Sequence, residues 1–100
     1  MDCNIPETVV NDIVEFAREN NIQKVILFGS RAKGTHTERS DIDIAVSGGN
    51  FDGFYWSIKE KVRSLLSFDI VDLDTKISEE LQGEIERNGI VIYEKYEKVR

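Results

Sequence analysis

The sequence contains very few residues of the types that build disulfides or thiolate metal sites. Its 100 residues include one cysteine, Cys3, and one histidine, His36. A single cysteine excludes an intramolecular disulfide and provides no cysteine cluster for a metal. His36 lies in the polar segment 35–39, which indicates a surface residue rather than a metal ligand or a catalytic base.

Long apolar runs and long basic runs are absent as well. No stretch approaches the roughly 20 consecutive apolar residues that cross a membrane, and the N-terminus has no signal-peptide pattern, so we expect a cytoplasmic protein with no membrane contact. The chain has 19 acidic and 13 basic side chains and a net charge of −6. This balance argues against direct nucleic-acid binding and favours a basic protein partner.

The length predicts one domain over residues 1–100. A chain of this size, with 40% apolar residues, has room for a single core that buries somewhat over ~60% of the surface of the unfolded chain. Repeats, low-complexity segments and linkers are absent.

One segment combines a buried strand with a turn suited to an anion. The apolar run 25–28 predicts a strand buried on both faces. Gly29 follows it directly, and a glycine lets the backbone come close to a bulky ligand. Ser30, Arg31 and Lys33 add a hydroxyl and two positive charges. The composition therefore suits a polyphosphate.

This turn is not a P-loop, because Gly34 is followed by Thr35 and His36 rather than by Lys and Ser or Thr. Taken alone, a glycine-rich turn after a strand is more often a simple connection than a phosphate site. An isolated Asp-x-Asp is likewise usually a solvated strand end or a helix cap. The prediction of a phosphate and metal site therefore rests on the combination of the glycine-rich turn, the Asp-x-Asp pair and a later aspartate.

A second strand is predicted over residues 41–46, where acidic and apolar residues alternate. The apolar side chains face one side of this strand, and Asp41 and Asp43 face the other. Their Cβ atoms would be about 7 Å apart, so their carboxylates can share one divalent ion or bracket two. Oxygen ligands beside a triphosphate suit Mg²⁺.

A third carboxylate is available in the apolar-rich segment 68–74. Alternation places Asp69 on one face of this predicted strand and Asp72 on the other, and periodicity does not choose between them. An aspartate in so apolar a run is costly to bury unless it is paired or binds a metal. The segment therefore predicts a functional role for one of the two.

The remaining pattern predicts helices around the sheet. One helix starts at residues 4–7 and ends at residues 20–21, and another begins near Ser78 and ends at residues 88–89. Between them, Ile58, Val62, Leu65 and Leu66 indicate one face of a further helix. A strand is predicted over residues 90–93, followed by a charged tail, 94–100. The predicted fold class is α/β, more closely α+β, with a mixed sheet of about four strands flanked by helices.

The aromatic residues Phe54, Tyr55 and Trp56 are predicted to start the middle helix. They could stack a base, but packing in the core is the commoner use of such residues.

Together these motifs resemble a known family. Gly29-Ser30, ten intervening residues and Asp41-x-Asp43 resemble the signature of the DNA polymerase β-like nucleotidyltransferase superfamily. Within it, the chain resembles the minimal nucleotidyltransferases, which share the Gly-Ser-Arg-x-x-Gly start, the Ser-Asp-Ile-Asp strand and a later strand with two aspartates. The closing helix and strand, 85–93, fit as well, and the resemblance covers residues 22–93.

The resemblance implies the nucleotidyltransferase palm and assigns roles to the matching positions. Gly29 and Ser30 would hold the β- and γ-phosphates. Asp41 and Asp43 would bind Mg²⁺, with two ions expected. Asp69, rather than Asp72, would be the third carboxylate, which assists the metal or accepts the proton of the attacking hydroxyl. Further phosphate or supporting contacts are expected from Arg31, Lys33 and Ser40.

The resemblance also implies an activity and a partner. The expected reaction is transfer of a nucleotide, AMP from ATP foremost, to a hydroxyl of a partner protein. Such proteins are often paired with a helical HEPN-domain protein, and in some pairs the nucleotidyltransferase is an antitoxin that adenylylates a tyrosine of a ribonuclease toxin. Larger relatives carry a second domain, so we expect the acceptor to come from another chain, in a homo- or hetero-oligomer.

The alternative is a catalytically inactive binding module that neutralises or scaffolds a helical partner by contact alone. The intact set of three carboxylates favours the enzyme, because binding by contact does not require carboxylates to converge.

Overall fold

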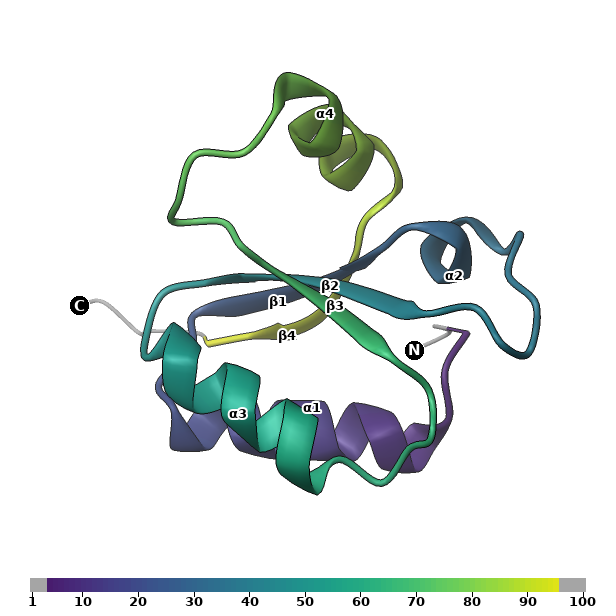
Figure 1. Cartoon of the computed structure of the whole chain (residues 1–100). Coiled ribbons are helices and arrows are strands. Elements are labelled where there is room, and N and C mark those ends of the chain that lie inside the picture. Colours follow the sequence, from purple (N-terminus) through teal and green to yellow (C-terminus); the bar gives the residue numbers. More distant parts are fainter. Residues whose placement is uncertain (1–3, 96–100) are drawn as a thin grey trace.

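The computed structural model describes residues 4–95 and is built around one four-stranded sheet (Figure 1). Two helices lie side by side along one face of the sheet, and a third covers the other face. The elements are α1 (Glu7–Glu19), β1 (Lys24–Phe28), α2 (Ser30–Lys33), β2 (Ile42–Ser47), α3 (Phe51–Lys61), β3 (Phe68–Asp72), α4 (Glu79–Asn88) and β4 (Ile90–Glu94).

The sheet is mixed, as predicted. Its strand order is β3-β2-β1-β4, with β1 antiparallel to both of its neighbours and β2 parallel to β3. A parallel pair needs a long crossover connection, and α3 provides it. The α+β class is therefore confirmed. Cys3 and most of the predicted charged tail lie outside the described residues, and β4 takes up the first residue of that tail, Glu94.

The larger core lies between the sheet and the helices α1 and α3. Side chains of both helices pack against alternate residues of the strands, and Ile42, Ile44 and Val46 of β2 are all fully buried there. Phe54 is also fully buried, which confirms core packing for this aromatic residue, whereas Trp56 is 57% exposed. This face of the sheet is closed by apolar packing and provides most of the hydrophobic stabilisation.

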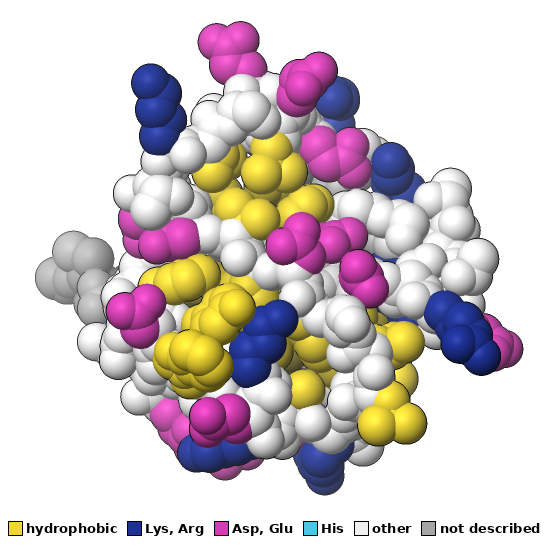
Figure 2. Space-filling model, viewed as in Figure 1, with side chains coloured by type: hydrophobic (Ala, Val, Ile, Leu, Met, Phe, Trp, Pro, Cys, Tyr) yellow, Lys and Arg dark blue, Asp and Glu magenta, His cyan; other side chains and the backbone are white. Residues whose placement is uncertain are grey.

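The opposite face carries a smaller core. Phe28, Ala45 and Ile85 are buried between β1, β2 and α4, with Leu73 and Leu81 partly buried beside them. Figure 2 shows hydrophobic surface between α4 and the sheet, bordered by acidic side chains. The α4 face is therefore less completely covered and leaves room for polar groups.

The middle helix ends earlier than the apolar spacing predicted. Val62 leaves the helix with φ −67° and ψ 140°, so Leu65 and Leu66 lie in the following loop, and Leu65 is fully exposed. The reason is Arg63, whose main-chain N–H and guanidinium both donate to the buried carboxylate of Asp12 on α1. These bonds require an extended backbone at a point where side-chain spacing alone favours a helix.

Helix α4 has the predicted boundaries. The Ser78 hydroxyl accepts a hydrogen bond from the Leu81 N–H at 3.1 Å, which caps the first turn. Ile85 is buried, and the helix ends at Asn88. Among residues 4–95, no helix has the length and apolar character that a bilayer crossing requires.

The pair of Asp12 and Arg63 predicts a pH-dependent contribution to stability. Hydrogen bonds from the Arg63 guanidinium hold the pKa of Asp12 below its usual value. A carboxyl group with a lowered folded-state pKa stabilises the fold above its unfolded-state pKa of about 4 and loses this effect as the pH falls through the folded-state value. We expect Asp12→Asn to lower the melting temperature by several degrees at neutral pH.

This deficit should shrink as the pH falls through the lowered folded-state pKa, where the wild-type carboxyl group itself becomes protonated. Thermal unfolding followed by circular dichroism between neutral and strongly acidic pH measures both effects. Glu19→Gln, at an exposed position of the same helix, is the matched control. A deficit of constant size over the whole pH range would contradict the assignment.

Candidate active site

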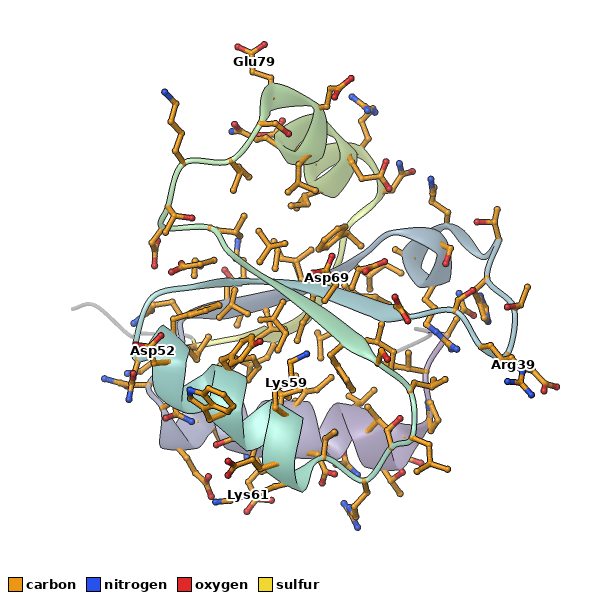
Figure 3. All side chains as sticks on the ribbon, in the orientation of Figure 1. Arg39, Asp52, Lys59, Lys61, Asp69 and Glu79 are labelled. Carbon is orange, nitrogen blue, oxygen red and sulfur yellow. The ribbon has the colours of Figure 1, made fainter. Side chains whose placement is uncertain are left out.

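The strand pairing brings the predicted turn and the predicted carboxylates to one end of the sheet. Asp43 is paired with Phe28 on one side and with Asp69 on the other. Gly29 follows Phe28 directly, and Asp41 lies one residue before β2. Residues that are 40 positions apart in the sequence, from Gly29 to Asp69, therefore meet across three adjacent strands. Figure 3 shows Asp69 on the side of the sheet where α4 lies.

Gly29 is required by both its backbone conformation and its surroundings. It has φ 76° and ψ −156°, a region of conformational space that is essentially reserved for glycine. A Cβ atom at this position would overlap the Asp43 carboxylate. The carbonyl of Gly29 accepts hydrogen bonds from Ala32 and Lys33, which start the short helix α2. The turn therefore passes directly beside Asp43 and carries the half-buried Ser30 at its exit.

The site concentrates negative charge around Asp43. The pKa of Asp43 is raised to about 6, mainly by partial burial and in addition by the charges of Asp69, Asp41 and Glu84. Asp41 and Asp69 are exposed, whereas Asp43 is half-buried. A cation bound among these carboxylates would remove their mutual repulsion.

The three predicted metal ligands do not form a ready-made coordination shell. Within residues 4–95, no three carboxylate, imidazole or thiol groups are close enough together to hold a metal ion. Like charges repel, and the two exposed aspartates are free to turn toward solvent. The donor set still fits a hard divalent ion such as Mg²⁺, because it consists of carboxylate oxygens whose charges act on one another. Side-chain rotation of Asp41 and Asp69 would be needed to complete the shell.

Sequence reasoning missed Glu84, a fourth carboxylate at the site. It lies on α4, and its charge contributes to the raised pKa of Asp43. Glu84 follows Leu81 by three positions and precedes Ile85, so the spacing indicates a residue on or beside the inward face of the helix. This spacing can be read from the sequence, but the sequence does not show which strands the helix covers.

The predicted phosphate contacts separate into two groups. Lys33 is an exposed residue of α2, and its Nζ lies 3.6 Å from a carboxylate oxygen of Glu84. Arg31 is buried, and its polar atoms are bonded to the main chain. Its guanidinium donates to the main-chain carbonyls of four residues: Asn4, Thr37, Glu38 and Ser40.

Three of these carbonyls belong to the loop of residues 37–40, which includes Ser40 itself. The Ser40 hydroxyl accepts a hydrogen bond from the Thr37 N–H at 2.9 Å. Arg31 and Ser40 thus hold the loop that leads to Asp41, and a phosphate contact for either stays a prediction. His36, in the same loop, is half-buried rather than fully exposed.

Comparison with known proteins identifies the family. The family described as "Polymerase beta, Nucleotidyltransferase" matches residues 11–98. This chain belongs to that nucleotidyltransferase family. The resemblance inferred from the sequence is therefore confirmed, and the family generally uses divalent metals.

Individual relatives agree with this assignment. Protein adenylyltransferase MntA of Shewanella oneidensis is 39% identical over 69 residues, which are 63% of this chain and 50% of that protein. A relative from Methanocaldococcus jannaschii is 44% identical over 61 residues, with coverage of 60% and 58%. The chain thus spans little more than half the length of these curated relatives.

A crystal structure of a toxin–antitoxin with AMP-PNP aligns with a TM-score of 0.69 at 28% identity and covers 86% of this chain and 73% of that one. The fold of this chain is therefore found in a protein crystallised with a nucleotide analogue.

The contact between Gly29 and Asp43 predicts different outcomes for two glycine substitutions. Both Gly29 and Gly34 have positive φ, but within the described part of the chain no atom lies within 4 Å of the Cβ position at Gly34. Gly34→Ala should therefore lower the free energy of unfolding by about 1 kcal/mol, through backbone strain alone. Gly29→Ala should lower it by roughly 2–3 kcal/mol or more and displace the Asp43 carboxylate.

Urea denaturation of the two variants measures the difference. Gly34→Ala makes the same change of side chain at a residue of similar φ. It therefore measures the cost of placing alanine at a positive φ without a clash. If the two substitutions lowered the free energy of unfolding equally, the Asp43 side chain would move aside without an energetic cost, and the prediction would be wrong.

The raised pKa of Asp43 predicts that this carboxylate opposes folding at neutral pH when no cation is present. A folded-state pKa of about 6 lies above the unfolded value of about 4, so stability falls as the pH rises between these values. The shift corresponds to about 3 kcal/mol, which screening by solvent reduces to on the order of 1 kcal/mol. In EDTA at pH 7.5, Asp43→Asn should therefore melt roughly 4–8 °C above the wild type.

The two proteins should melt together near pH 4, where the wild-type side chain is protonated as well. Differential scanning calorimetry across this range gives both results. Glu60→Gln, at an exposed position of α3, makes the same change of charge far from the cluster and should show no such trend. An Asp43→Asn variant that melts below the wild type at pH 7.5 would contradict the charge argument.

Proposed function

We propose that this chain is a Mg²⁺-dependent nucleotidyltransferase that transfers AMP from ATP to a hydroxyl of a partner protein. The observation that carries the proposal is the register of the sheet, which pairs Asp43 with Asp69 and places Gly29 against Asp43 in a chain of this family.

In this proposal each group of the site has a defined role, and Asp69 has two. Gly29 and Ser30 hold the β- and γ-phosphates, while Asp41, Asp43 and Asp69 hold two Mg²⁺ ions. The ions would supply neutralisation of the charge on the phosphates and on the attacking oxygen. The acceptor oxygen forms a bond to the α-phosphorus, and the bond from that phosphorus to the bridging oxygen of the β-phosphate breaks, so pyrophosphate leaves. Asp69 accepts the proton of the hydroxyl.

The partner in this proposal is a HEPN-type toxin, with this chain as its antitoxin in a cytoplasmic hetero-oligomer. One relative is named a protein adenylyltransferase, and a similar chain was crystallised as part of a toxin–antitoxin. The net charge of −6 fits a basic partner, because opposite charges accelerate association. The acceptor hydroxyl, a tyrosine by resemblance to the family, then comes from the toxin.

A second candidate function is a binding module that neutralises a helical partner without catalysis. The observation in its favour is the lack, within the described part of the chain, of a preassembled group of three metal ligands. The two candidates differ in whether the carboxylates are needed, so they can be separated by substitution.

The test is incubation of the purified protein with α-labelled ATP, Mg²⁺ and extract of the source organism, followed by a search for a labelled protein band. We expect one band, and we expect the Asp41→Asn/Asp43→Asn double variant to lower its labelling by at least roughly a hundredfold, because charge stabilisation at the reacting phosphate is lost. ATP with Mg²⁺ should also raise the melting temperature of the wild type only.

A double variant at exposed positions of α3, Asp52→Asn/Glu60→Gln, makes the same change in net charge and should label normally. If none of the four nucleoside triphosphates gives a label, and the Asp41→Asn/Asp43→Asn variant still neutralises its partner, the binding module is the correct function.

A further inference from the structure

The ion pair between Lys33 and Glu84 connects the phosphate turn to α4. Lys33 Nζ lies 3.6 Å from Glu84 Oε2, and the two side chains are 43% and 26% exposed. Lys33 follows Ser30 by three residues, so both lie on the same side of the short helix α2. Glu84 is held in place by its neighbour Ile85, which is buried with Phe28 and Ala45.

This ion pair is incompletely satisfied. Its separation exceeds the 2.7–3.2 Å of a protein hydrogen bond. The Oε2 atom of Glu84 is enclosed by protein atoms and has no hydrogen-bond partner among residues 4–95. Burying a charged oxygen without a hydrogen bond is unfavourable, so the pair is held less firmly than its burial would suggest. The charge of Glu84 also contributes to the raised pKa of Asp43.

A triphosphate at the Gly29 turn would compete with Glu84 for Lys33. Phosphate oxygens accept short, charge-assisted hydrogen bonds from ammonium groups. In the present geometry, Glu84 accepts no such short bond from Lys33. We propose that Glu84 is a positioning residue that holds Lys33 in the nucleotide-free protein and yields it to the polyphosphate of a bound nucleotide, which lowers the affinity of the site for ATP and for the departing pyrophosphate. This inference rests on the proposed function of the site.

Two consequences follow from such a competition. ATP must displace Glu84 from Lys33 in order to bind, so the competition lowers the affinity for ATP, whereas AMP does not reach Lys33 and its affinity is unaffected. Once pyrophosphate has left, Glu84 recovers Lys33, which opposes rebinding of the product. Glu84 does not need to contact the nucleotide for either effect, because it acts through Lys33.

A simpler explanation is that Glu84 only adds negative charge to the site and repels every anion. The two explanations differ in their dependence on Lys33. Competition requires the lysine, so Glu84→Gln should lose its effect once Lys33 is removed. General repulsion does not require it, so the substitution should act equally with and without the lysine.

The experiment is a double-mutant cycle in which the dissociation constants of ATP and AMP with Mg²⁺ are measured by calorimetry. We expect Glu84→Gln to tighten ATP binding about three- to tenfold, as for loss of a competing, partly exposed ion pair, and to leave AMP binding unchanged. Lys33→Met should weaken ATP binding, and adding Glu84→Gln to it should change the ATP affinity by less than about twofold.

Glu80→Gln is the matched control, because it removes the same charge from an exposed position one turn earlier on α4. It should leave both affinities unchanged, and melting curves confirm that every variant is folded. Equal tightening by Glu84→Gln in both backgrounds, or no tightening in the wild type, overturns the role of Glu84 and leaves the proposed function standing. Failure of the wild-type protein to bind ATP overturns both.

Discussion

The fit of the Asp43 carboxylate against the backbone of Gly29 is the constraint on which the candidate site depends. The carboxylate occupies the volume that any side chain at position 29 would need, and the glycine adopts a conformation that other residues avoid. The contact joins the end of β1 to the start of β2. Because β2 also pairs with β3, the same register brings Asp69 to the site. One close approach of backbone to side chain therefore fixes the relation between the turn and two of the three aspartates.

The two faces of the sheet divide stability and function between them. The face covered by α1 and α3 is closed by apolar side chains, and the pair of Asp12 and Arg63 fastens the loop that follows α3. The α4 face has a smaller core and collects three carboxylates around the half-buried Asp43. Such a concentration of like charge is unfavourable for folding. The closed face can offset this cost, which is why a domain of this size tolerates an unstable arrangement at its site.

Sequence patterns predicted the parts of this structure that depend on local alternation. The period of two in β2 placed Asp41 and Asp43 opposite the core, and the capping residue Ser78 marked the start of α4. Alternation could not choose between Asp69 and Asp72, because that choice requires the strand register. The structure supplies it, since Asp69 is the residue beside Asp43, whereas a carboxylate oxygen of Asp72 accepts the Asp74 N–H.

Other features could not be predicted because they depend on contacts between distant segments. The early end of α3 follows from the hydrogen bonds between Arg63 and Asp12, which are 51 positions apart. The place of Glu84 follows from the packing of α4 over β1 and β2, which no local pattern specifies.

Arg31 gives a structural reason for the spacing between the turn and the first aspartate. Read as sequence, it is a positive charge next to a phosphate turn. In the fold its guanidinium donates to four main-chain carbonyls, three of them in the loop of residues 37–40. A lysine could not replace it, because an ammonium group presents its donors from one point whereas the planar guanidinium presents them along a fork. The loop ends at Ser40, so fixing it also fixes the backbone at Asp41. The arginine thus positions a carboxylate, although its charge and its place in the sequence indicate a phosphate ligand.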